Sequence, residues 1–87
     1  MALGGVNKMD EIKEILSKNS YTILKCEKVC YSDYVYFYAN EKIHCISYNP
    51  IAPVKYVFSK ENGKMPKFIY CGNDIKKLEE KINALRK

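Results

Sequence analysis

One stretch of the chain, from Tyr34 to Ala39, alternates between two kinds of side chain at every residue. Tyrosines stand at every second position and apolar residues between them: Tyr34, Tyr36 and Tyr38 alternate with Val35, Phe37 and Ala39. Because successive side chains of a β-strand point to opposite faces of its sheet, this alternation predicts a strand with one apolar face and one tyrosine face. Such a strand suits an antiparallel sheet that is covered on one side only.

Helical and extended patterns around this strand complete the predicted fold. Two segments carry apolar residues at helical spacing, one beginning at the potential cap Asn7 and ending near Ser17, the other running from Ile75 to Leu85. Aromatic and β-branched residues, which favour strands, are concentrated in five segments: Tyr21–Glu27, Val29–Ala39, Lys42–Tyr48, Val54–Ser59 and Lys67–Cys71. We therefore expect a small two-layer α+β domain in the order α-β-β-β-β-β-α. Its four- to five-stranded antiparallel sheet should carry the N- and C-terminal helices on one face.

The apolar positions of these segments predict one core. Its expected members are Ile12, Ile15, Leu16, Ile23, Val35, Phe37, Ile46, Val57, Phe68, Ile75, Leu78, Ile82 and Leu85.

The chain length of 87 residues allows one small domain. The small residues of Met1–Val6 predict a flexible lead-in, followed by a single domain over residues 7–87. No apolar run is long enough to span a bilayer and no signal peptide is evident, so we expect a cytoplasmic protein with no membrane partner. In that compartment free thiols are the default for the four cysteines, Cys26, Cys30, Cys45 and Cys71.

A turn at Asn40-Glu41 would fix which residues share the tyrosine face. A two-residue turn there sets Tyr38 opposite Ile43, Tyr36 opposite Cys45 and Tyr34 opposite Ser47, and sets Phe37 opposite His44 on the other side. Glutamate disfavours the positive φ of such a turn, which makes the signal weak. The first hypothesis is that the domain is a non-enzymatic protein-binding module, adaptor- or inhibitor-like, that uses Tyr34, Tyr36 and Tyr38. Homodimerisation is its simplest form, and the plain alternative is that tyrosine suits a strand.

Positive charge is concentrated in the last third of the chain. Residues 1–54 hold six lysines and six acidic residues, so the whole net charge of +5 lies after Val54. Asn62-Gly63 is a strong hairpin signal, and a two-residue turn there would set Lys67 opposite Phe58 and Lys55 opposite Tyr70. Cations interleaved with aromatic rings are typical of single-stranded nucleic-acid binding, which is the second hypothesis. Its site would comprise Lys55, Lys60, Lys64, Lys67, Tyr56 and Tyr70. Lysines that protect exposed edge strands are the plain alternative.

Catalytic and metal-binding patterns are sparse. His44 and Cys45 are adjacent and would point to opposite faces of a strand, which separates the one base from the nearest nucleophile. Cys26 and Cys30 have a spacing that zinc sites allow, but a second close ligand pair is missing, and Cys45 and Cys71 would have to converge on them. No glycine-rich phosphate loop is present. We expect no enzyme activity, no cofactor and no metal.

Overall fold

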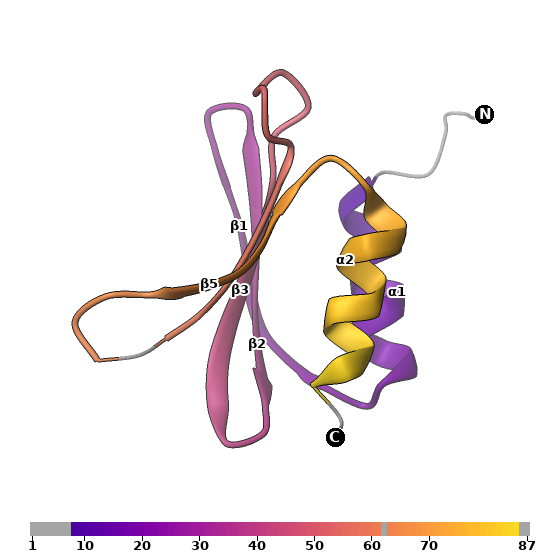
Figure 1. The fold of residues 1–87 in the computed structure, drawn as a ribbon, viewed down its shortest axis with the longest axis vertical. Coiled ribbons are helices and arrows are strands. Elements are labelled where there is room, and N and C mark those ends of the chain that lie inside the picture. The colour runs from indigo at the N-terminus through magenta and orange to yellow at the C-terminus, as the bar shows by residue number, and fades with distance from the viewer. Residues whose placement is uncertain (1–7, 62, 86–87) are drawn as a thin grey trace.

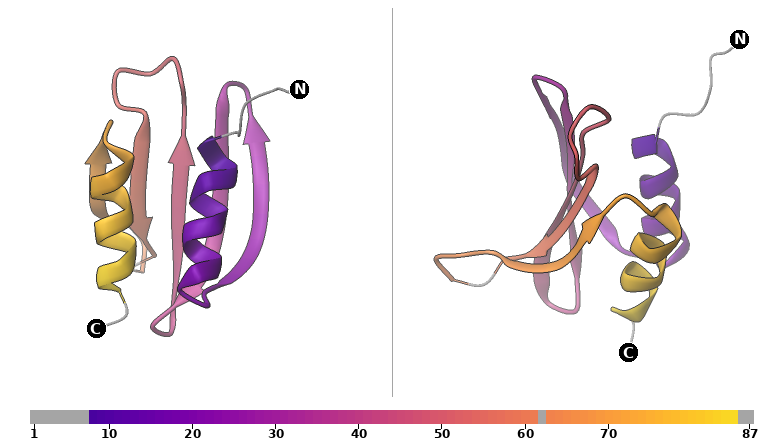
Figure 2. Two further views of the ribbon diagram at one scale, coloured as in Figure 1. Left: turned by 90° about the vertical axis from the view of Figure 1, so that its right-hand side faces the viewer. Right: turned by 45° about the horizontal axis from the view of Figure 1, so that its top comes forward.

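The computed structural model describes residues 8–61 and 63–85, which form two layers (Figure 1). The elements are α1 (Lys8–Lys18), β1 (Thr22–Val29), β2 (Ser32–Ala39), β3 (Lys42–Tyr48), β4 (Tyr56–Lys60), β5 (Lys67–Gly72) and α2 (Ile75–Ala84). The strands form one sheet in chain order, each antiparallel to its neighbour. Both helices lie on the same face of this sheet (Figures 1 and 2). The predicted fold class is confirmed; the predicted lead-in and the potential cap Asn7 lie outside the described residues.

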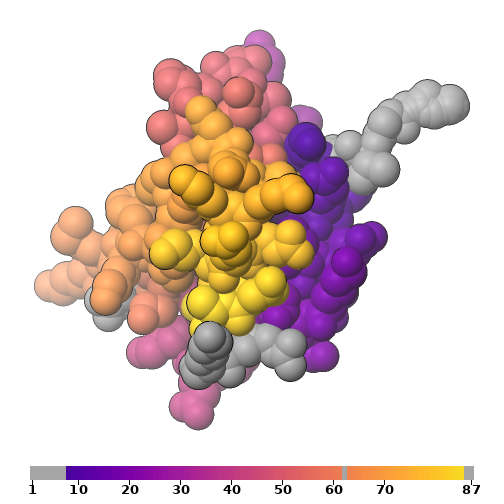
Figure 3. Space-filling view, turned by 45° about the vertical axis from the view of Figure 1, so that its right-hand side comes forward, coloured from indigo at the N-terminus to yellow at the C-terminus, as the bar shows by residue number. Residues whose placement is uncertain are grey.

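Each helix packs a narrow apolar stripe on the sheet. In α1 the stripe consists of Met9, Ile12, Ile15 and Leu16, and acidic residues occupy the first turn, where the positive end of the helix dipole favours them. In α2 the stripe is Leu78 and Ile82. Asp74 begins this helix as its N-cap, since its carboxylate accepts a hydrogen bond of 2.9 Å from the backbone N–H of Lys76. Figure 3 shows the two helices side by side over this face of the molecule.

Polar side chains from the α1–β1 connection and the β2–β3 turn fix the C-terminal end of α2. The Tyr21 hydroxyl donates to the backbone carbonyl of Ile82 (3.2 Å), and the Asn40 amide donates to that of Leu85. The buried amide of Asn19 donates to the side-chain oxygen of Asn83 at 2.9 Å. The last carbonyls of a helix lack partners within it, so these contacts both satisfy α2 and hold it against the sheet.

The β2–β3 hairpin has the predicted register. Asn40 and Glu41 form its two-residue turn with φ of 52° and 63°. Two successive positive φ values define the turn type whose twist matches a hairpin. Tyr38 accordingly lies opposite Ile43, Tyr36 opposite Cys45 and Tyr34 opposite Ser47. The glutamate therefore occupies a conformation that its side chain disfavours, and the pairing of the two strands outweighs that cost.

The boundary between the first two strands differs from the prediction. β1 continues through Val29, which pairs with Ser32, and the connection is the two-residue turn Cys30-Tyr31. The predicted strand from Val29 to Ala39 is therefore wrong in its first three residues. Cys30 adopts a φ of 56°, a conformation in which glycine or asparagine is usually found. Because neither residue stands here, the sequence did not predict this turn.

The register predicted for the last hairpin is also wrong. Phe58 lies opposite Tyr70 and Lys60 opposite Lys67, with an irregularity in the pairing between Phe58 and Ser59. A two-residue turn at Asn62-Gly63 would have set Pro66 opposite Ser59, and proline has no N–H for the ladder. It would also have set Lys67 beside the buried Phe58. The longer loop avoids both costs, and the hairpin leans away from the helices (Figures 1 and 2).

The core lies between the helices and the central strands. Phe37 is its centre: its ring centroid lies 5.2 Å from that of His44, 5.8 Å from that of Tyr21 and 6.0 Å from that of Phe58. Of the predicted core residues, Ile12, Ile15, Leu16, Val35, Phe37, Ile46, Leu78 and Ile82 are buried. Ile23, Ile75 and Leu85 are partly buried against them.

Two predicted core residues lie elsewhere, and several buried residues were missed. Val57 and Phe68 belong to the face of the sheet opposite α1 and α2, because the cross-strand partner of Val57 is Ser47 and that of Phe68 is Ser59. Phe68 is 62 % exposed. The buried residues absent from the predicted core set are Met9, Asn19, Ala39, His44, Tyr56 and Phe58, although the sequence placed Met9, Ala39 and His44 on the faces that are buried. The error arises in β4, where Tyr56, Val57 and Phe58 are all apolar and alternation does not choose a face.

His44 makes the stability of the domain depend on pH. Its side chain is 1 % exposed, and burial, with a smaller effect from Lys60, lowers its pKa below 6.5, although its hydrogen bond to the Lys42 carbonyl opposes the shift. The unfolded chain therefore binds a proton at a higher pH than the folded chain does. The contribution of neutral His44 to the free energy of unfolding is fully present above pH 6.5. It falls as the pH drops toward the lowered pKa, by at most about 1.4 kcal/mol per pH unit.

Urea unfolding between pH 4.5 and 8 measures this effect. We expect a His44→Gln variant to be less stable at pH 8 than the natural chain, yet to lose less stability between pH 6.5 and 5. Equal acid sensitivity in the two proteins would contradict the assignment to His44.

Candidate functional site

The face of the sheet opposite the helices is the candidate site. The register brings side chains of neighbouring strands together on this face, which we call the tyrosine face. It comprises Tyr34, Tyr36 and Tyr38 from β2, Ile43, Cys45 and Ser47 from β3, Val57 and Ser59 from β4, and Phe68 from β5. The sequence predicted the tyrosines and their partners on β3, but it missed Val57 and Phe68. Their place on this face depends on the pairing of β4 with β3, which sets Val57 opposite Ser47 and Ser59 opposite Cys45, and Phe68 of β5 lies opposite Ser59.

Several side chains of the tyrosine face are open to solvent. Tyr38 is 45 % exposed, Ile43 41 % and Phe68 62 %, while Tyr34 and Tyr36 are half-buried by their neighbours. The register places these three exposed residues on the same face of the sheet, with β4 between Ile43 and Phe68. Exposed apolar side chains gathered on one face mark an interaction site more often than scattered residues do.

Tyr36 occupies the middle of the face and has a partner on each side. Lys25 of β1 places its Nζ atom 4.9 Å from the centroid of the Tyr36 ring, and Cys45 lies opposite on β3. Lys25 also forms an ion pair of 3.5 Å with Glu27. The cation over the ring is thus balanced by a carboxylate on the same strand, which leaves no excess charge beside the central tyrosine.

The ionisable groups at the centre of the face are uncharged at neutral pH. Burial, followed by the proximity of Cys45 and Glu27, raises the pKa of Tyr36 above 10.0. Burial likewise raises the pKa of the Cys45 thiol above 9.0. A thiol that stays protonated is a poor nucleophile and a poor metal ligand. The centre of this face therefore offers ring surface, hydroxyl groups and aliphatic carbon, with the Lys25–Glu27 ion pair beside it.

The structure separates the residues predicted for nucleic-acid binding. Tyr56 is 3 % exposed on the helix side of the sheet, with its ring centroid 5.2 Å from that of Tyr48, so it offers no ring face to a base. Tyr70 is half-buried near Gly72, and its hydroxyl bonds to the backbone of Asp74. Lys55 precedes β4, where its N–H donates to the side chain of Asn73.

The other three lysines of the predicted nucleic-acid site remain together in the last hairpin. Lys60 and Lys67 are cross-strand partners, and Lys64 lies in the loop between them. The exposed ring of Phe68 follows Lys67 directly in β5. Consecutive residues of a strand point to opposite faces, so Phe68 lies on the tyrosine face whereas Lys60 and Lys67 lie on the helix side. The structure thus keeps the lysines close together but separates them from this ring.

The four cysteines are free thiols that do not converge. Cys26, Cys30 and Cys71 are exposed and Cys45 is half-buried. Over residues 8–61 and 63–85, no three histidine, cysteine, aspartate or glutamate side chains lie close enough together to hold a metal ion.

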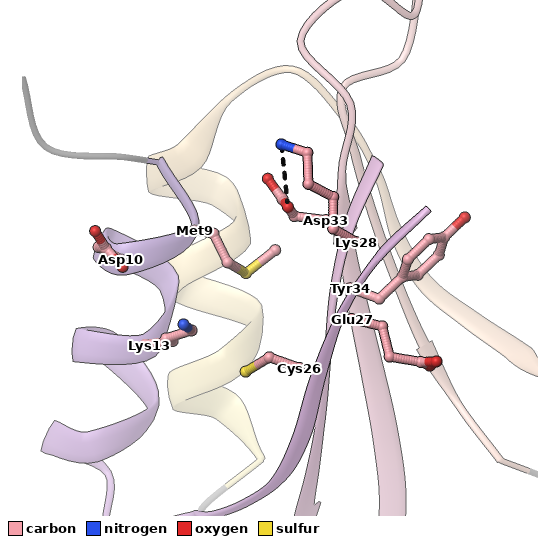
Figure 4. A pocket seen from close by; sticks show the side chains of 8 residues that line it. All are labelled: Met9, Asp10, Lys13, Cys26, Glu27, Lys28, Asp33 and Tyr34. Carbon is pink, nitrogen blue, oxygen red and sulfur yellow. Dashed lines mark ion pairs between the residues drawn. The ribbon is translucent and has the colours of Figure 1, made fainter. Parts of the chain in front are cut away.

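A shallow hollow of about 240 Å³ lies beside the β1–β2 hairpin, next to α1 (Figure 4). Met9 and Cys26 point between the helix and the sheet, whereas Glu27 and Tyr34 point to the other side of β1. Lys28 and Asp33 form an ion pair of 3.8 Å at its upper end. Since the polar groups of the hollow point in different directions, they are not aimed at one ligand.

Comparison with protein-family models, with curated proteins and with solved structures finds no match to this chain. Neither helix in the described part of the chain is both long and apolar enough to cross a membrane.

Proposed function

We propose that this domain is a non-enzymatic protein-binding module, adaptor- or inhibitor-like, and that the tyrosine face is its binding surface. The observation that carries the proposal is the one-sided covering of the sheet: both helices pack on one face, and the other presents tyrosine, isoleucine and phenylalanine side chains to solvent. Tyrosine is enriched at protein interfaces because it combines a large contact area with a hydroxyl group at low entropic cost.

The charge of the face favours a protein partner over a polyanion. Lys25 is paired with Glu27, and Tyr36 and Cys45 are neutral, so the centre of the face carries no excess positive charge. Binding of a nucleic-acid backbone depends on cations that neutralise phosphates. The exposed free thiols of Cys26, Cys30 and Cys71 suit a reducing compartment, so the proposal places the domain in the cytoplasm.

The test compares protein capture by the full chain and by a triple variant, Tyr34→Ala, Tyr36→Ala and Tyr38→Ala, in nuclease-treated lysate of the source. We expect the natural chain to retain specific proteins and the triple variant to lose them. A cooperative thermal unfolding transition of the triple variant shows that this variant is folded. Tyr31→Ala is the matched control, because Tyr31 is 66 % exposed in the β1–β2 turn, away from the face.

Two results would overturn the proposal. One is a folded triple variant that keeps every association of the natural chain. The other applies if the triple variant does not fold. Tyr38→Glu then replaces it, because the Tyr38 side chain is already 45 % exposed. Full retention of binding by Tyr38→Glu would overturn the proposal.

Single-stranded nucleic-acid binding is the second candidate function. The observation in its favour is the lysine cluster Lys60, Lys64 and Lys67 in a hairpin that also carries the exposed ring of Phe68 on its other face. Three phosphate contacts predict that the logarithm of the affinity falls with the logarithm of salt concentration at a slope of about −2. Lys64→Ala should reduce that slope by about 0.7, and Phe68→Ala should weaken binding by about 1–3 kcal/mol if a base stacks there.

Fluorescence titration with mixed-sequence oligonucleotides in about 50 mM salt checks these numbers. A dissociation constant weaker than about 10⁻⁴ M, the weak end of non-specific affinity, would eliminate this candidate. The protein-binding proposal predicts no salt-dependent oligonucleotide affinity.

A further inference from the structure

The β4–β5 hairpin projects from the body of the domain on the side of the tyrosine face. Figure 1 shows it extending away from the sheet in the direction opposite to the helices, and the turned view of Figure 2 agrees. Every residue described from Glu61 to Phe68 is exposed, including the apolar side chains of Met65 (75 %) and Phe68 (62 %). One chain therefore carries a projection that bears two exposed apolar side chains among its lysines, and an aromatic surface on the same side of the sheet.

The positions of these two features on the sheet are complementary. The tyrosines lie on β2, next to one edge strand, and the hairpin is formed by β4 and β5 at the opposite edge. A two-fold axis parallel to the strands would place two tyrosine faces against each other, with β5 of each copy over the β1–β2 side of the other. In that arrangement each hairpin meets the tyrosines of its neighbour, and the contact closes after two copies, as an isologous interface requires.

The area of the tyrosine face alone is smaller than a stable dimer interface needs. Five strands about 4.8 Å apart, with about seven residues at 3.3 Å each, outline an area of roughly 550 Å². A typical stable interface buries about 800 Å² on each partner. Two flat faces alone would therefore fall short, and two hairpins that each cover part of the neighbouring copy would add the missing area.

We propose that the partner of the tyrosine face is a second copy of this chain, held in a two-fold dimer in which each β4–β5 hairpin clasps the tyrosine face of the other copy. This inference rests on the proposed function, because it names the partner of the same surface. Met65 and Phe68 are the apolar residues that the hairpin inserts, and Tyr34, Tyr36 and Tyr38 receive them.

Sedimentation equilibrium of the nuclease-treated full chain tests the dimer. We expect twice the chain mass of 10.1 kDa at about 100 µM, and Met65→Asp and Tyr38→Asp should each weaken the dimer at least about tenfold. Ile51→Asp is the matched control: Ile51 is 68 % exposed in the β3–β4 loop, and its substitution should leave the dimer unchanged.

Mixing the two variants tests whether the clasp is reciprocal. A heterodimer of Met65→Asp and Tyr38→Asp keeps one natural hairpin facing one natural tyrosine face, whereas each variant alone has neither contact intact. We therefore expect the mixture to associate more tightly than either variant alone, with one of them tagged so that capture reports the heterodimer.

Three outcomes would overturn the clasped dimer: a natural chain that stays monomeric, a Met65→Asp variant that dimerises as tightly as the natural chain, or a mixture that shows no recovery. In the first case, a dimer mass that is present only before nuclease treatment would assign the association to nucleic acid. A monomeric chain whose capture of another protein still depends on the tyrosines would overturn the dimer and leave the proposed function standing.

Discussion

Leu78→Asp is expected to abolish the folded state. Leu78 is fully buried in α2, where it contributes to the stripe that packs this helix on the sheet. Removal of a buried leucine side chain costs about 2–5 kcal/mol, and burial of an unpaired carboxylate adds several more. A domain of this size has a total stability of about 4–13 kcal/mol, so the combined loss is comparable with all of it.

Circular dichroism during heating measures this effect, with Lys77→Asp as the control. Lys77 is the exposed neighbour of Leu78 in the same helix, so this variant introduces the same carboxylate without burying it. We expect a cooperative transition in the control and none in Leu78→Asp. A Leu78→Asp protein that melts within a few degrees of the natural chain would show that the α2 stripe is not part of the core.

The parts of the fold that could be predicted are those whose signals are local. The alternation from Tyr34 to Ala39 defined both faces of β2, and the short distance to the next apolar run placed the turn at Asn40-Glu41. The 3.6-residue spacing of apolar side chains defined the stripes of both helices. In each case the period of one segment was enough, because one face of that segment is buried and the other is not.

The remaining errors come from features that depend on pairing between segments. In the last hairpin, Pro66 disfavours the turn that Asn62-Gly63 would otherwise favour, and the resulting register sets Tyr70 opposite Phe58 on the helix side of the sheet. In β1, the pairing with β2 shifts between Ile23 and Lys25, and this irregularity places Lys25 rather than Leu24 beside Tyr36. Neither shift leaves a periodic signal in its own strand, so the tyrosines of the candidate site were predictable and their neighbours on β1, β4 and β5 were not.

Phe37→Ala and Tyr38→Ala are expected to differ in stability by several kcal/mol although the two residues are adjacent. Phe37 is fully buried and its ring lies near those of Tyr21, His44 and Phe58, so its truncation leaves a cavity and should cost about 3–5 kcal/mol. Tyr38 is 45 % exposed on the tyrosine face, where the loss of cross-strand packing with Ile43 and Thr22 should cost about 1 kcal/mol or less.

Urea unfolding of both variants gives the two free energies directly, and a shared slope against urea concentration would show that both unfold from comparable states. Similar losses at the two positions would mean that the tyrosine face is packed as part of the fold, which would remove the basis for a binding surface there. The expected large difference has a functional consequence. Because folding depends little on the exposed tyrosine, the side chains of this face are free to serve an interaction, and variants that alter binding without unfolding the domain can be made at Tyr38.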